Sequence, residues 1–346
     1  MATRPAAKSS SATPDDPAAG LSIVVPAYNE APGLPHLHAR LVEVARKLKA
    51  ERGLAIEIVY VDDGSGDGTG AIAAGLPANA VDVQAISLSR NFGKEAALLA
   101  GLDHARFGAI LFMDGDGQHP PALIDTLVAR WLDDGYDVVY TAKAHRENES
   151  WARRKLVHAF YWLINLGAHQ QIPEDAGDFR LLSPRAVTAL RQLPERTRFF
   201  KGLASWIGYR QVRVDYEPAP RAHGQTTWDL RGLVGLSIDG LTSFSVAPLR
   251  VASVLGFAFA TIALLFGVEI LIETLMFGRD VAGYPSLIVS AMVLGGVQLI
   301  MIGVLGEYIG KILAELKGRP NYFIAERSLK QAEADAKAKT PARAEP

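Results

Sequence analysis

Two long apolar runs near the C-terminal end constrain the fold of this chain more than any other feature of its sequence. Residues 251–268 and residues 281–306 contain no charged side chain, and each run is long enough to cross a bilayer as a helix. A pair of buried helices in a soluble core would have the same composition. Because the runs follow each other after the short linker FGRDVAGYP, we favour a membrane hairpin, with helices at residues 249–272 and 285–308.

The charges that flank the two runs predict the orientation of the hairpin. Arg250 precedes the first run, and Lys311, Lys317 and Arg319 follow the second, whereas the linker carries one arginine and one aspartate. Basic residues are enriched on the cytoplasmic side of membrane helices. We therefore expect a multi-pass protein of the inner or plasma membrane. Its soluble domain and its C-terminal tail, residues 311–346, are expected in the cytoplasm. The last segment of the tail, residues 328–346, is expected to be a fraying helix that runs into disorder.

The composition of the chain excludes several classes of function. Lys and Arg together number 36 and Asp and Glu 37, for a net charge of −1, so no basic field favours nucleic acid as a partner. The chain has no cysteine, which excludes disulfides, thiolate zinc sites and cysteine nucleophiles. Residues 1–20 are small, polar and proline-rich. They are predicted to form a disordered tail and lack the apolar core of a signal peptide.

Between this tail and the hairpin, residues 21–228 alternate between strand-like and helical patterns. Short β-branched runs are followed by stretches with apolar residues at helical spacing. This order predicts an α/β fold, with an open and mostly parallel sheet covered by helices on both faces. The predicted strands are residues 21–26, 56–61, 81–88, 109–113 and 137–140, with two more in GDFRLL and QVRVDYE, and the predicted helices include residues 31–50, 68–76, 94–105 and 121–132.

Residues 229–248 lead directly into the first apolar run. Leu230, Leu233, Leu241 and Phe244 recur there at roughly helical spacing. We interpret this stretch as an amphipathic helix that lies in the membrane interface. An ordinary core helix would show the same pattern.

Polar clusters follow three of the predicted strands. The carboxyl ends of parallel strands share one edge of a sheet, and ligands bind at that edge in folds of this class. The three clusters are Tyr28-Asn29-Glu30, Asp62-Asp63, and Asp114 with Asp116. We therefore expect these clusters to converge on one ligand site.

The acidic stretch FMDGDGQHPP, residues 112–121, is compatible with more than one kind of site. The glycine-rich stretch GSGDGTG at residues 64–70 matches neither the dinucleotide-binding nor the P-loop pattern. A calcium loop that starts at Asp114 is excluded, because His119 stands where such a loop requires glycine. A plain turn rich in Asp and Gly remains open, as does a site for a divalent cation.

A divalent-cation site agrees best with the position of this stretch at a strand end. Asp114 and Asp116 can hold one Mg²⁺ or Mn²⁺ between them, with the amide oxygen of Gln118 as a further hard ligand. A cation held in this way keeps open positions for a diphosphate. Gly115 and Gly117 leave room for phosphates to approach the backbone. The sequence therefore predicts a metal site that takes a phosphorylated substrate.

Seven motifs occur together along residues 21–325. They are VVPAYNE, VDDGSGDGT, SRNFGKEAALLAGL, MDGDGQHPP, DAGDFRLL, LPERTRFFKGL and DGLTSFSVAPLR. As a set they resemble glycosyltransferase family 2, and within it the enzymes that act on undecaprenyl or dolichyl phosphate. The resemblance implies a GT-A fold, a Rossmann-like domain that binds a nucleotide-sugar donor. It also implies a homo-oligomer assembled through the membrane-proximal region.

Individual positions take their expected roles from this resemblance. Metal binding is implied for Asp114, Asp116 and Gln118, and catalysis for Asp116, Asp178 and Arg180. Donor binding is implied for Pro26, Tyr28, Glu30, Asp63, Lys94 and Asp114, with Arg90, Asn91 and Gly93 in the same motif as Lys94. Binding of the acceptor phosphate is implied for Lys143, Arg153 and Arg154, each of which could instead be a solvated surface charge.

The reaction implied is transfer of a hexose from a nucleotide sugar to a polyprenyl phosphate, at a membrane that the lipid acceptor cannot leave. A phosphomonoester is largely ionised near neutral pH, so it can attack and invert the anomeric carbon without a strong base. UDP-glucose is the expected donor, and GDP-mannose and other UDP-sugars are alternatives. Thr227 stands where many relatives have a lysine, which leaves the donor open. No role is predicted for His119.

Three other functions share parts of this pattern. A processive polysaccharide synthase would need Q-x-x-R-W and more membrane spans, yet Leu127 stands where the glutamine before Arg130-Trp131 is required. A sugar nucleotidyltransferase has no need of a membrane hairpin. A non-catalytic membrane scaffold would not need intact acidic clusters.

Overall fold

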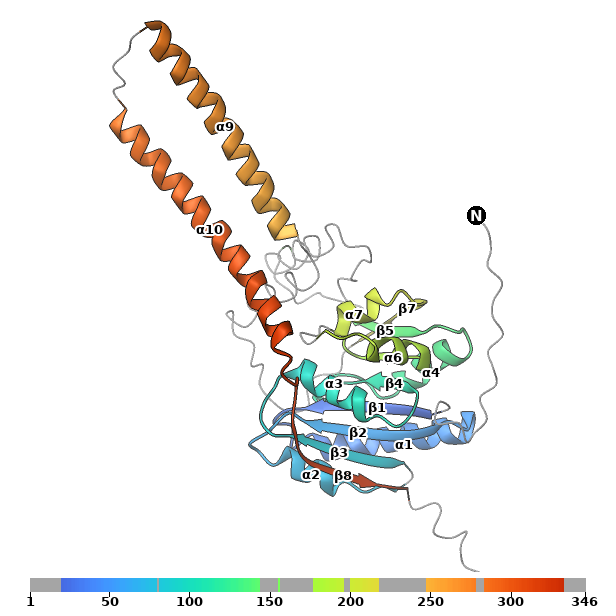
Figure 1. Ribbon diagram of the computed structural model, residues 1–346. Coiled ribbons are helices and arrows are strands. Elements are labelled where there is room, and N and C mark those ends of the chain that lie inside the picture. Colours follow the sequence, from blue (N-terminus) through green and yellow to red (C-terminus); the bar gives the residue numbers. More distant parts are fainter. Residues whose placement is uncertain are drawn as a thin grey trace, which may run out of the picture. The chain divides into compact units, whose positions relative to one another are not determined.

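The computed structural model describes residues 20–79, 81–143, 155, 177–195, 200–217, 247–277 and 283–332. The chain divides into two compact units. The first contains a β-sheet with its helices, and the second contains a pair of long helices (Figure 1).

The first unit is built on one eight-stranded sheet. In spatial order its strands are β7 (Gln211–Tyr216), β5 (Val138–Lys143), β6 (Arg180–Leu182), β4 (Ala109–Phe112), β1 (Gly20–Ala27), β2 (Ala55–Asp62), β3 (Asp82–Leu88) and β8 (Ile324–Lys330). The central strands β4, β1, β2 and β3 are parallel, as are β5 and β7. Strand β6 is antiparallel to both β4 and β5. The mostly parallel α/β sheet predicted from the sequence is confirmed.

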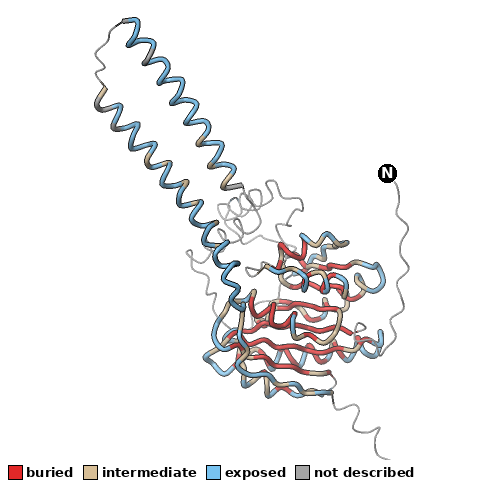
Figure 2. The backbone as a smooth tube through the Cα atoms, in the orientation of Figure 1, coloured by how far each residue is buried: buried red, intermediate tan, exposed pale blue. Residues whose placement is uncertain are grey.

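Helices pack on both faces of the parallel centre. The helices that the structure describes in this unit are α1 (Leu34–Arg52), α2 (Thr69–Gly75), α3 (Lys94–His104), α4 (Leu123–Leu132), α6 (Pro184–Arg191) and α7 (Phe200–Trp206). Successive residues of a strand point to opposite faces, so Ile23 and Val25 of β1 join a buried core with α1 and α4. On the other face, a Cβ at Gly101 of α3 would lie 2.2 Å from Cγ1 of Val24. The central strands are buried along most of their length (Figure 2).

Strand β6 brings a distant segment beside the end of β4. Its register pairs Arg180 with Phe112, the last residue of β4. The two strands are antiparallel, so Asp178, two residues before Arg180, lies beyond the same end of the sheet as Asp114, two residues after Phe112. The fold therefore places the GDFR segment next to the D-x-D motif.

Strand β8 corrects the expectation for residues 311–346, which were predicted to form a tail that ends as a fraying helix. Ile324–Lys330 instead forms an edge strand antiparallel to β3, with Ser328 opposite Ala85. The Arg327 side chain donates to Gln84 Oε1 from Nη2 at 2.7 Å and from Nε at 3.2 Å. The stability of a short polar edge strand comes from its neighbour across the sheet, which local sequence patterns do not reveal.

In the second unit the structure describes two long helices, α9 (Ala247–Phe277) and α10 (Tyr284–Lys317). Stretches of 28 and 29 residues in them are long and apolar enough to cross a membrane, and the most apolar window of each is 0% buried (Figure 2). Core helices of a soluble protein would be covered, so this exposure favours the membrane hairpin. The helices cover the predicted spans, 249–272 and 285–308. The predicted amphipathic helix at 229–248 lies outside the described residues, except for its last two positions, which belong to α9.

The order of elements along the chain agrees with two spans. Strand β8 follows α10 and pairs with β3, which precedes α9. A chain that crosses a membrane twice emerges on the side from which it entered. Two crossings therefore leave β8 able to complete the sheet.

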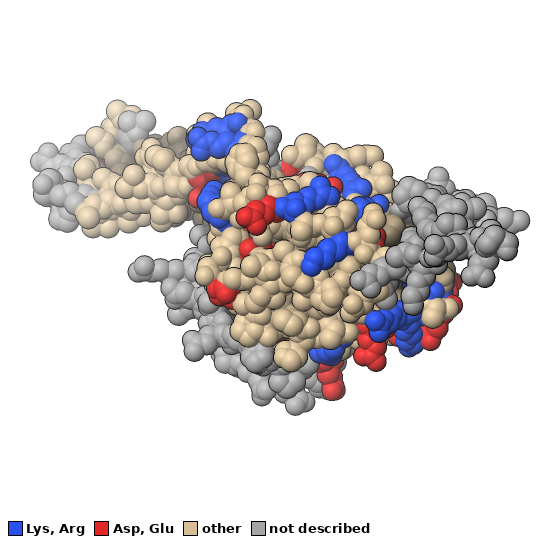
Figure 3. All heavy atoms as spheres, turned by 90° about the horizontal axis from the view of Figure 1, so that it is seen from below, with Lys and Arg blue, Asp and Glu red and all other residues tan. Residues whose placement is uncertain are grey.

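Surface charges are mixed on the face of the molecule seen in Figure 3. Lys and Arg side chains lie there among Asp and Glu side chains and uncharged residues. In the first unit, ion pairs join α1 to α4 and to the residue that follows α4, between Lys47 and Asp125 and between Arg52 and Asp133, each at 2.6 Å. Interspersed charges of both signs produce only short-ranged fields at physiological ionic strength.

Candidate active site

The loops that follow β1 and β2 are joined by hydrogen bonds. The Asn29 amide N donates to Ser65 Oγ at 2.9 Å, and the Gly66 amide N donates to Asn29 Oδ1 at 3.2 Å. Asn29 has a φ of 55°, in the left-handed region that asparagine adopts more readily than most residues. These bonds hold the segment that carries Tyr28 and Glu30, two of the predicted donor-binding residues.

Asp63 fixes the loop that leads from β3 into α3. Its side chain is buried, and its two oxygens accept hydrogen bonds from the amides of Phe92 at 2.8 Å and Gly93 at 2.9 Å. Burial raises the pKa of Asp63, and these two bonds partly oppose the rise. Gly64 has a φ of 66°, and a Cβ there would lie 2.3 Å from the carbonyl carbon of Arg90. The two loops therefore pack backbone against backbone, and a contact of Asp63 with a donor stays a prediction.

Residues 114–118, the D-x-D loop, form a tight turn beside β1. Asp116 Oδ1 accepts a hydrogen bond from the Gln118 amide at 3.0 Å. A Cβ on Gly115 would lie 3.1 Å from the carbonyl oxygen of Pro26, so a larger residue there would crowd the first strand. The loop thus brings both aspartates to the carboxyl edge of the sheet, as predicted.

His119 holds the D-x-D loop in shape. Its Nδ1 accepts a hydrogen bond from the Asp114 amide at 3.3 Å, which puts the proton of the neutral ring on Nε2. The buried ring stacks on Phe179 at 5.0 Å between centroids and meets the edge of Tyr216 at 5.7 Å. Burial lowers the pKa of His119, which favours this neutral form. The structure thus gives a positioning role to a residue for which the sequence predicted none.

Lys94 connects the D-x-D loop to the GDFR segment. Its Nζ lies 2.6 Å from Asp114 Oδ1 and 2.5 Å from Asp178 Oδ2. Lys201 Nζ lies 3.4 Å from the other oxygen of Asp178. Four charged side chains therefore follow one another in the order Asp114, Lys94, Asp178 and Lys201.

This row of charges shifts the pKa values of its members. Burial lowers the pKa of Lys94, but the Asp178 and Asp114 carboxylates outweigh it and place this pKa above its ordinary value. Burial raises the pKa of Asp178, but Lys94 and Lys201 outweigh it and hold this pKa well below the usual range. A carboxylate that binds protons so weakly is a poor general base. Asp178 is therefore better suited to hold the ammonium groups of Lys94 and Lys201 than to act as a general base.

Arg180 is 3% exposed and donates to backbone carbonyls. Its Nη2 lies 2.8 Å from the oxygen of Gly177, and its Nη1 lies 3.3 Å from the oxygen of Phe200. These contacts link the start of β6 to the start of α7. They give Arg180 a positioning role, and its predicted catalytic role stays a prediction.

Glu95 and Lys201 belong to this site, although the sequence analysis named neither. Glu95 Oε2 accepts a hydrogen bond from the Phe200 amide at 3.1 Å. Burial and then the charge of Asp178 raise the pKa of Glu95 to about 7. Both residues had a signal in the sequence, since Glu95 directly follows Lys94 and Lys201 lies in the FFKGL motif. Their roles depend on long-range contacts, of Glu95 with Phe200 and of Lys201 with Asp178, which the sequence does not give.

The remaining predicted residues differ in how far the structure describes them. Tyr28 is 48% exposed beside the end of β1, and Pro26 pairs with Val61 in β2. Lys143 ends β5 opposite Tyr216, and its side chain lies outside the description. The predictions for Arg153, Arg154 and Thr227 fall wholly outside the described residues.

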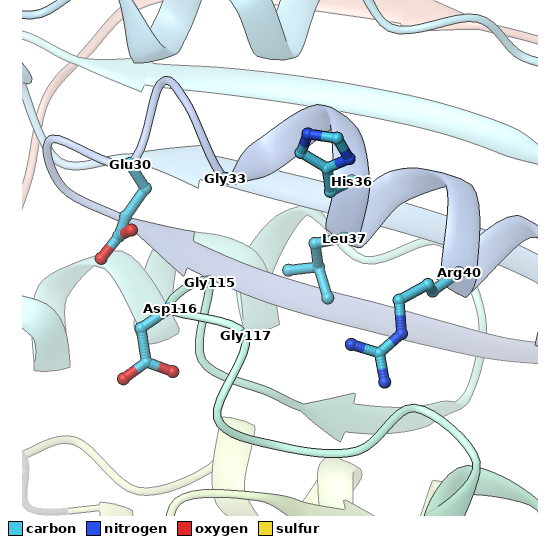
Figure 4. A pocket seen from close by; sticks show the side chains of 8 residues that line it. All are labelled: Glu30, Gly33, His36, Leu37, Arg40, Gly115, Asp116 and Gly117. Atoms are coloured by element: carbon cyan, nitrogen blue, oxygen red, sulfur yellow. The ribbon is translucent and has the colours of Figure 1, made fainter. Parts of the chain in front are cut away.

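A cleft of about 220 Å³ opens between the start of α1 and the D-x-D loop. Glu30 and Asp116 lie at one end of it and Arg40 at the other, with Leu37 between them (Figure 4). The two carboxylates point away from the guanidinium of Arg40 (Figure 4). The cleft therefore adjoins a predicted donor-binding residue and a predicted metal ligand.

The donor atoms of the D-x-D loop fit a divalent cation that is shared with a substrate. Within the part of the chain that the structure describes, no three His, Asp or Glu side chains are grouped as a complete metal site. Asp114 and Asp116 alone would supply two hard carboxylate ligands. Mg²⁺ is commonly bound in this way, by one or two carboxylates together with substrate phosphates.

Comparisons with known proteins agree with this architecture. Residues 22–189 match the family model described as Glycosyl transferase family 2. An uncharacterized glycosyltransferase of Synechocystis sp. is 44% identical over 88% of this chain and 95% of its own length. A prophage-derived bactoprenol glucosyl transferase of Shigella flexneri is 42% identical over 88% of this chain and 97% of its own length.

Among solved structures, mannosyl-3-phosphoglycerate synthase from Rubrobacter xylanophilus is 19% identical. The match covers 70% of this chain and 79% of that chain, with a TM-score of 0.42. The family assignment follows from the two sequence relatives, which are 44% and 42% identical over nearly their whole lengths. On this basis the chain belongs to glycosyltransferase family 2.

Proposed function

We propose that this glycosyltransferase moves glucose from UDP-glucose to a polyprenyl phosphate such as undecaprenyl phosphate, with inversion at the anomeric carbon. The observation that carries the proposal is the 42% identity to a bactoprenol glucosyl transferase along 97% of that relative. The exposed apolar helices α9 and α10 support an acceptor that stays in a membrane.

The donor would bind at the carboxyl edge of β1 to β4. Pro26, Tyr28, Glu30 and Asp63 would surround the nucleoside, on loops that hydrogen bonds already hold in place. A rigid site of this kind loses little conformational entropy when the donor binds.

The diphosphate of the donor would lie over the D-x-D loop. Asp114 and Asp116 would hold Mg²⁺ or Mn²⁺, with Gln118 nearby, and the bound cation would neutralise charge on the leaving diphosphate. Lys94, which lies 2.6 Å from Asp114 Oδ1, would add a positive charge beside the same group.

The acceptor supplies the nucleophile. One oxygen of its phosphate forms a bond to the anomeric carbon, while the bond from that carbon to UDP breaks and UDP leaves with the electron pair. The phosphate is largely ionised near neutral pH, so no proton has to be removed from it. The lowered pKa of Asp178 agrees with this, since no residue has to act as a strong base.

The acceptor phosphate would have to reach this site at the membrane surface. Lys143, Arg153 and Arg154 are the basic residues proposed for it from the sequence, and basic groups near anionic lipid headgroups are favourable. The proposed arrangement is a multi-pass protein of the inner or plasma membrane with the first unit in the cytoplasm. Assembly into a homo-oligomer is part of the same proposal.

Mass analysis of the lipid product tests this function. Full-length protein would be incubated with Mn²⁺, undecaprenyl phosphate and, in separate reactions, UDP-glucose, UDP-galactose, UDP-N-acetylglucosamine and GDP-mannose. The expected product is a hexosyl phospholipid that forms fastest from UDP-glucose. Faster transfer from another donor would refute the choice of sugar, and transfer from none of them would refute the function.

A further inference from the structure

One carboxylate lies between two lysines in this site. Asp178 Oδ2 contacts Lys94 at 2.5 Å, and Asp178 Oδ1 lies 3.4 Å from Lys201. The guanidinium of Arg180 adds a third positive charge near the same carboxylate. Lys94 is shared with Asp114, so the row holds two carboxylates against two lysines and Arg180. The one positive charge in excess lies at the Lys201 end, which suits that end to receive another anion.

The two lysines differ in what else they contact. Lys94 also pairs with Asp114, the proposed metal ligand, at 2.6 Å. Lys201 lies at the opposite end of the row, and its separation of 3.4 Å from Asp178 is too long for a strong hydrogen bond. An ammonium group has three donors and can turn them to a closer acceptor. Of the two, Lys201 is therefore better placed to bind an incoming anion.

The backbone beside Lys201 is held from several directions. The Phe200 amide donates to Glu95 Oε2 at 3.1 Å, and the Phe200 carbonyl accepts from Arg180 at 3.3 Å. The Phe200 ring packs against Phe112 at 5.4 Å between centroids. The side chain of Lys201 is itself only 25% exposed. Lys201 thus has a fixed position beside the end of β4, unlike a surface lysine that samples many directions.

In a displacement with inversion, the nucleotide sugar and the polyprenyl phosphate should bind at different ends of the row from Asp114 to Lys201. The nucleophile and the leaving group occupy opposite faces of the anomeric carbon in such a reaction. The leaving diphosphate belongs to the metal end, near Asp114. The group that binds the attacking phosphate should therefore lie at the other end, where Lys201 is found.

We propose that Lys201 binds the phosphate of the polyprenyl phosphate acceptor, and that Asp178 holds the Lys201 ammonium in place between catalytic cycles. This assignment rests on the proposed function and deepens it, because it names a residue for the acceptor. Lys201 is distinct from Lys143, Arg153 and Arg154, which were assigned by resemblance. When the phosphate arrives, the ammonium moves from the shared carboxylate to the stronger dianion.

Two substitutions test the assignment in the full-length protein. Lys201→Met removes the charge and keeps a side chain of similar length, and Lys201→Arg keeps the charge. A matched control is Lys47→Met, because Lys47 also pairs with an aspartate, Asp125, but on the surface between α1 and α4. Binding of undecaprenyl phosphate and of UDP with Mn²⁺ would be measured separately, followed by kcat and by KM for each substrate.

Lys201→Met should weaken lipid binding and lower kcat/KM for the lipid by about 10- to 100-fold, the effect of losing one hydrogen bond between charged groups. UDP affinity should stay within about twofold, because the donor end of the row is unchanged. Lys201→Arg should recover most of the lipid affinity through its charge. Lys47→Met should match the wild type in every measurement.

Other results would overturn the assignment. Unchanged lipid binding in Lys201→Met would remove Lys201 from the acceptor site, and an equal loss of UDP affinity would place it on the donor side. The same measurements distinguish failure of the proposed function from failure of the Lys201 assignment. If the wild type binds the lipid through Lys201 but transfers no sugar, the proposed function is wrong and the assignment stands. If transfer proceeds unchanged in Lys201→Met, the assignment is wrong and the function stands. If the wild type does not bind the lipid, both are wrong.

Discussion

Asp63 and Asp178 are two carboxylates in one site with opposite surroundings. Asp63 accepts hydrogen bonds from two backbone amides, whereas Asp178 lies between the side chains of Lys94 and Lys201. Burial raises the pKa of Asp63. The two lysines outweigh burial at Asp178 and lower its pKa. The proposed donor side of the site, around Asp63, is therefore fixed by the backbone, and the ion-paired side, around Asp178, consists of charges that can regroup around substrates.

The largest effect is expected at Asp116, one of the two proposed metal ligands. Asp116→Asn keeps the oxygen that accepts from the Gln118 amide and removes the negative charge that would bind the cation. We expect kcat to fall by at least about 100-fold, the usual loss when a preorganised electrostatic group is removed. The unfolding temperature should change little, because the turn is retained.

Removal of the cation with a chelator tests the proposed metal site independently of any substitution. EDTA should reduce transfer by the wild type to the level of Asp116→Asn, and added Mn²⁺ should restore the wild type alone. Full activity of Asp116→Asn, or of the wild type in EDTA, would show that the D-x-D loop holds no catalytic cation.

Asp178→Asn should have the next largest effect, about 10- to 100-fold on kcat, because a hydrogen bond from Lys94 and an ion pair with Lys201 both lose their negative partner. The variant leaves Lys94 and Lys201 facing each other without the negative charge that separates them. Steady-state kinetics for both substrates would measure the loss. A pH profile that loses its acidic limb would instead mark Asp178 as a general base, against the role inferred from its lowered pKa.

Asp63→Asn should affect stability more than chemistry. An amide side chain has one acceptor oxygen, so the amide of either Phe92 or Gly93 would lose its partner in a buried place. We expect a loss of about 1–3 kcal/mol in the free energy of unfolding of the first unit, the usual cost of a buried donor left unpaired. UDP affinity would weaken as the loop loosens. If Asp63→Asn were as stable as the wild type but inactive, the two carboxylates would not differ in the way proposed here.

The sequence predicted the strands and helices around Asp63 well, because these elements depend on local patterns. Strands β1 to β4 are apolar runs that end in turn residues, and helices with regular apolar spacing follow them. The positions of Asp63, Asp114 and Asp116 at one edge of the sheet follow from strand order alone. Family resemblance added roles to these positions, and those roles remain predictions.

Long-range contacts explain what the sequence did not predict. Strand β8 forms because β3 offers it an edge more than 230 residues earlier, as the pairing of Ser328 with Ala85 illustrates. His119 gained its role from a ring stack on Phe179, 60 residues later. The partnership of Glu95 with Phe200 likewise joins α3 to α7. None of these contacts leaves a periodic signal in the residues that make it.

Glu95 should produce the smallest effect, a dependence of stability on pH. Its pKa rises from an ordinary value of 4.5 to about 7 in the folded protein, so the folded state binds the proton more tightly than the unfolded state. The stability that this provides is complete below about pH 4.5 and is lost as the pH rises through about 7. Glu95→Gln keeps an acceptor for the Phe200 amide and removes the titration. Relative to the wild type, the variant should therefore gain about 1–2 kcal/mol of stability between pH 6 and pH 8.

Unfolding temperatures of the full-length protein in detergent, measured at steps across this range, would detect the change. Glu51→Gln makes the same substitution at an exposed position of α1 and serves as the control. A difference between Glu95→Gln and the wild type that does not change with pH would mean that Glu95 is ionised throughout. In that case the cluster around Asp178 would carry one more negative charge, and the excess of positive charge that favours a phosphate at Lys201 would be smaller.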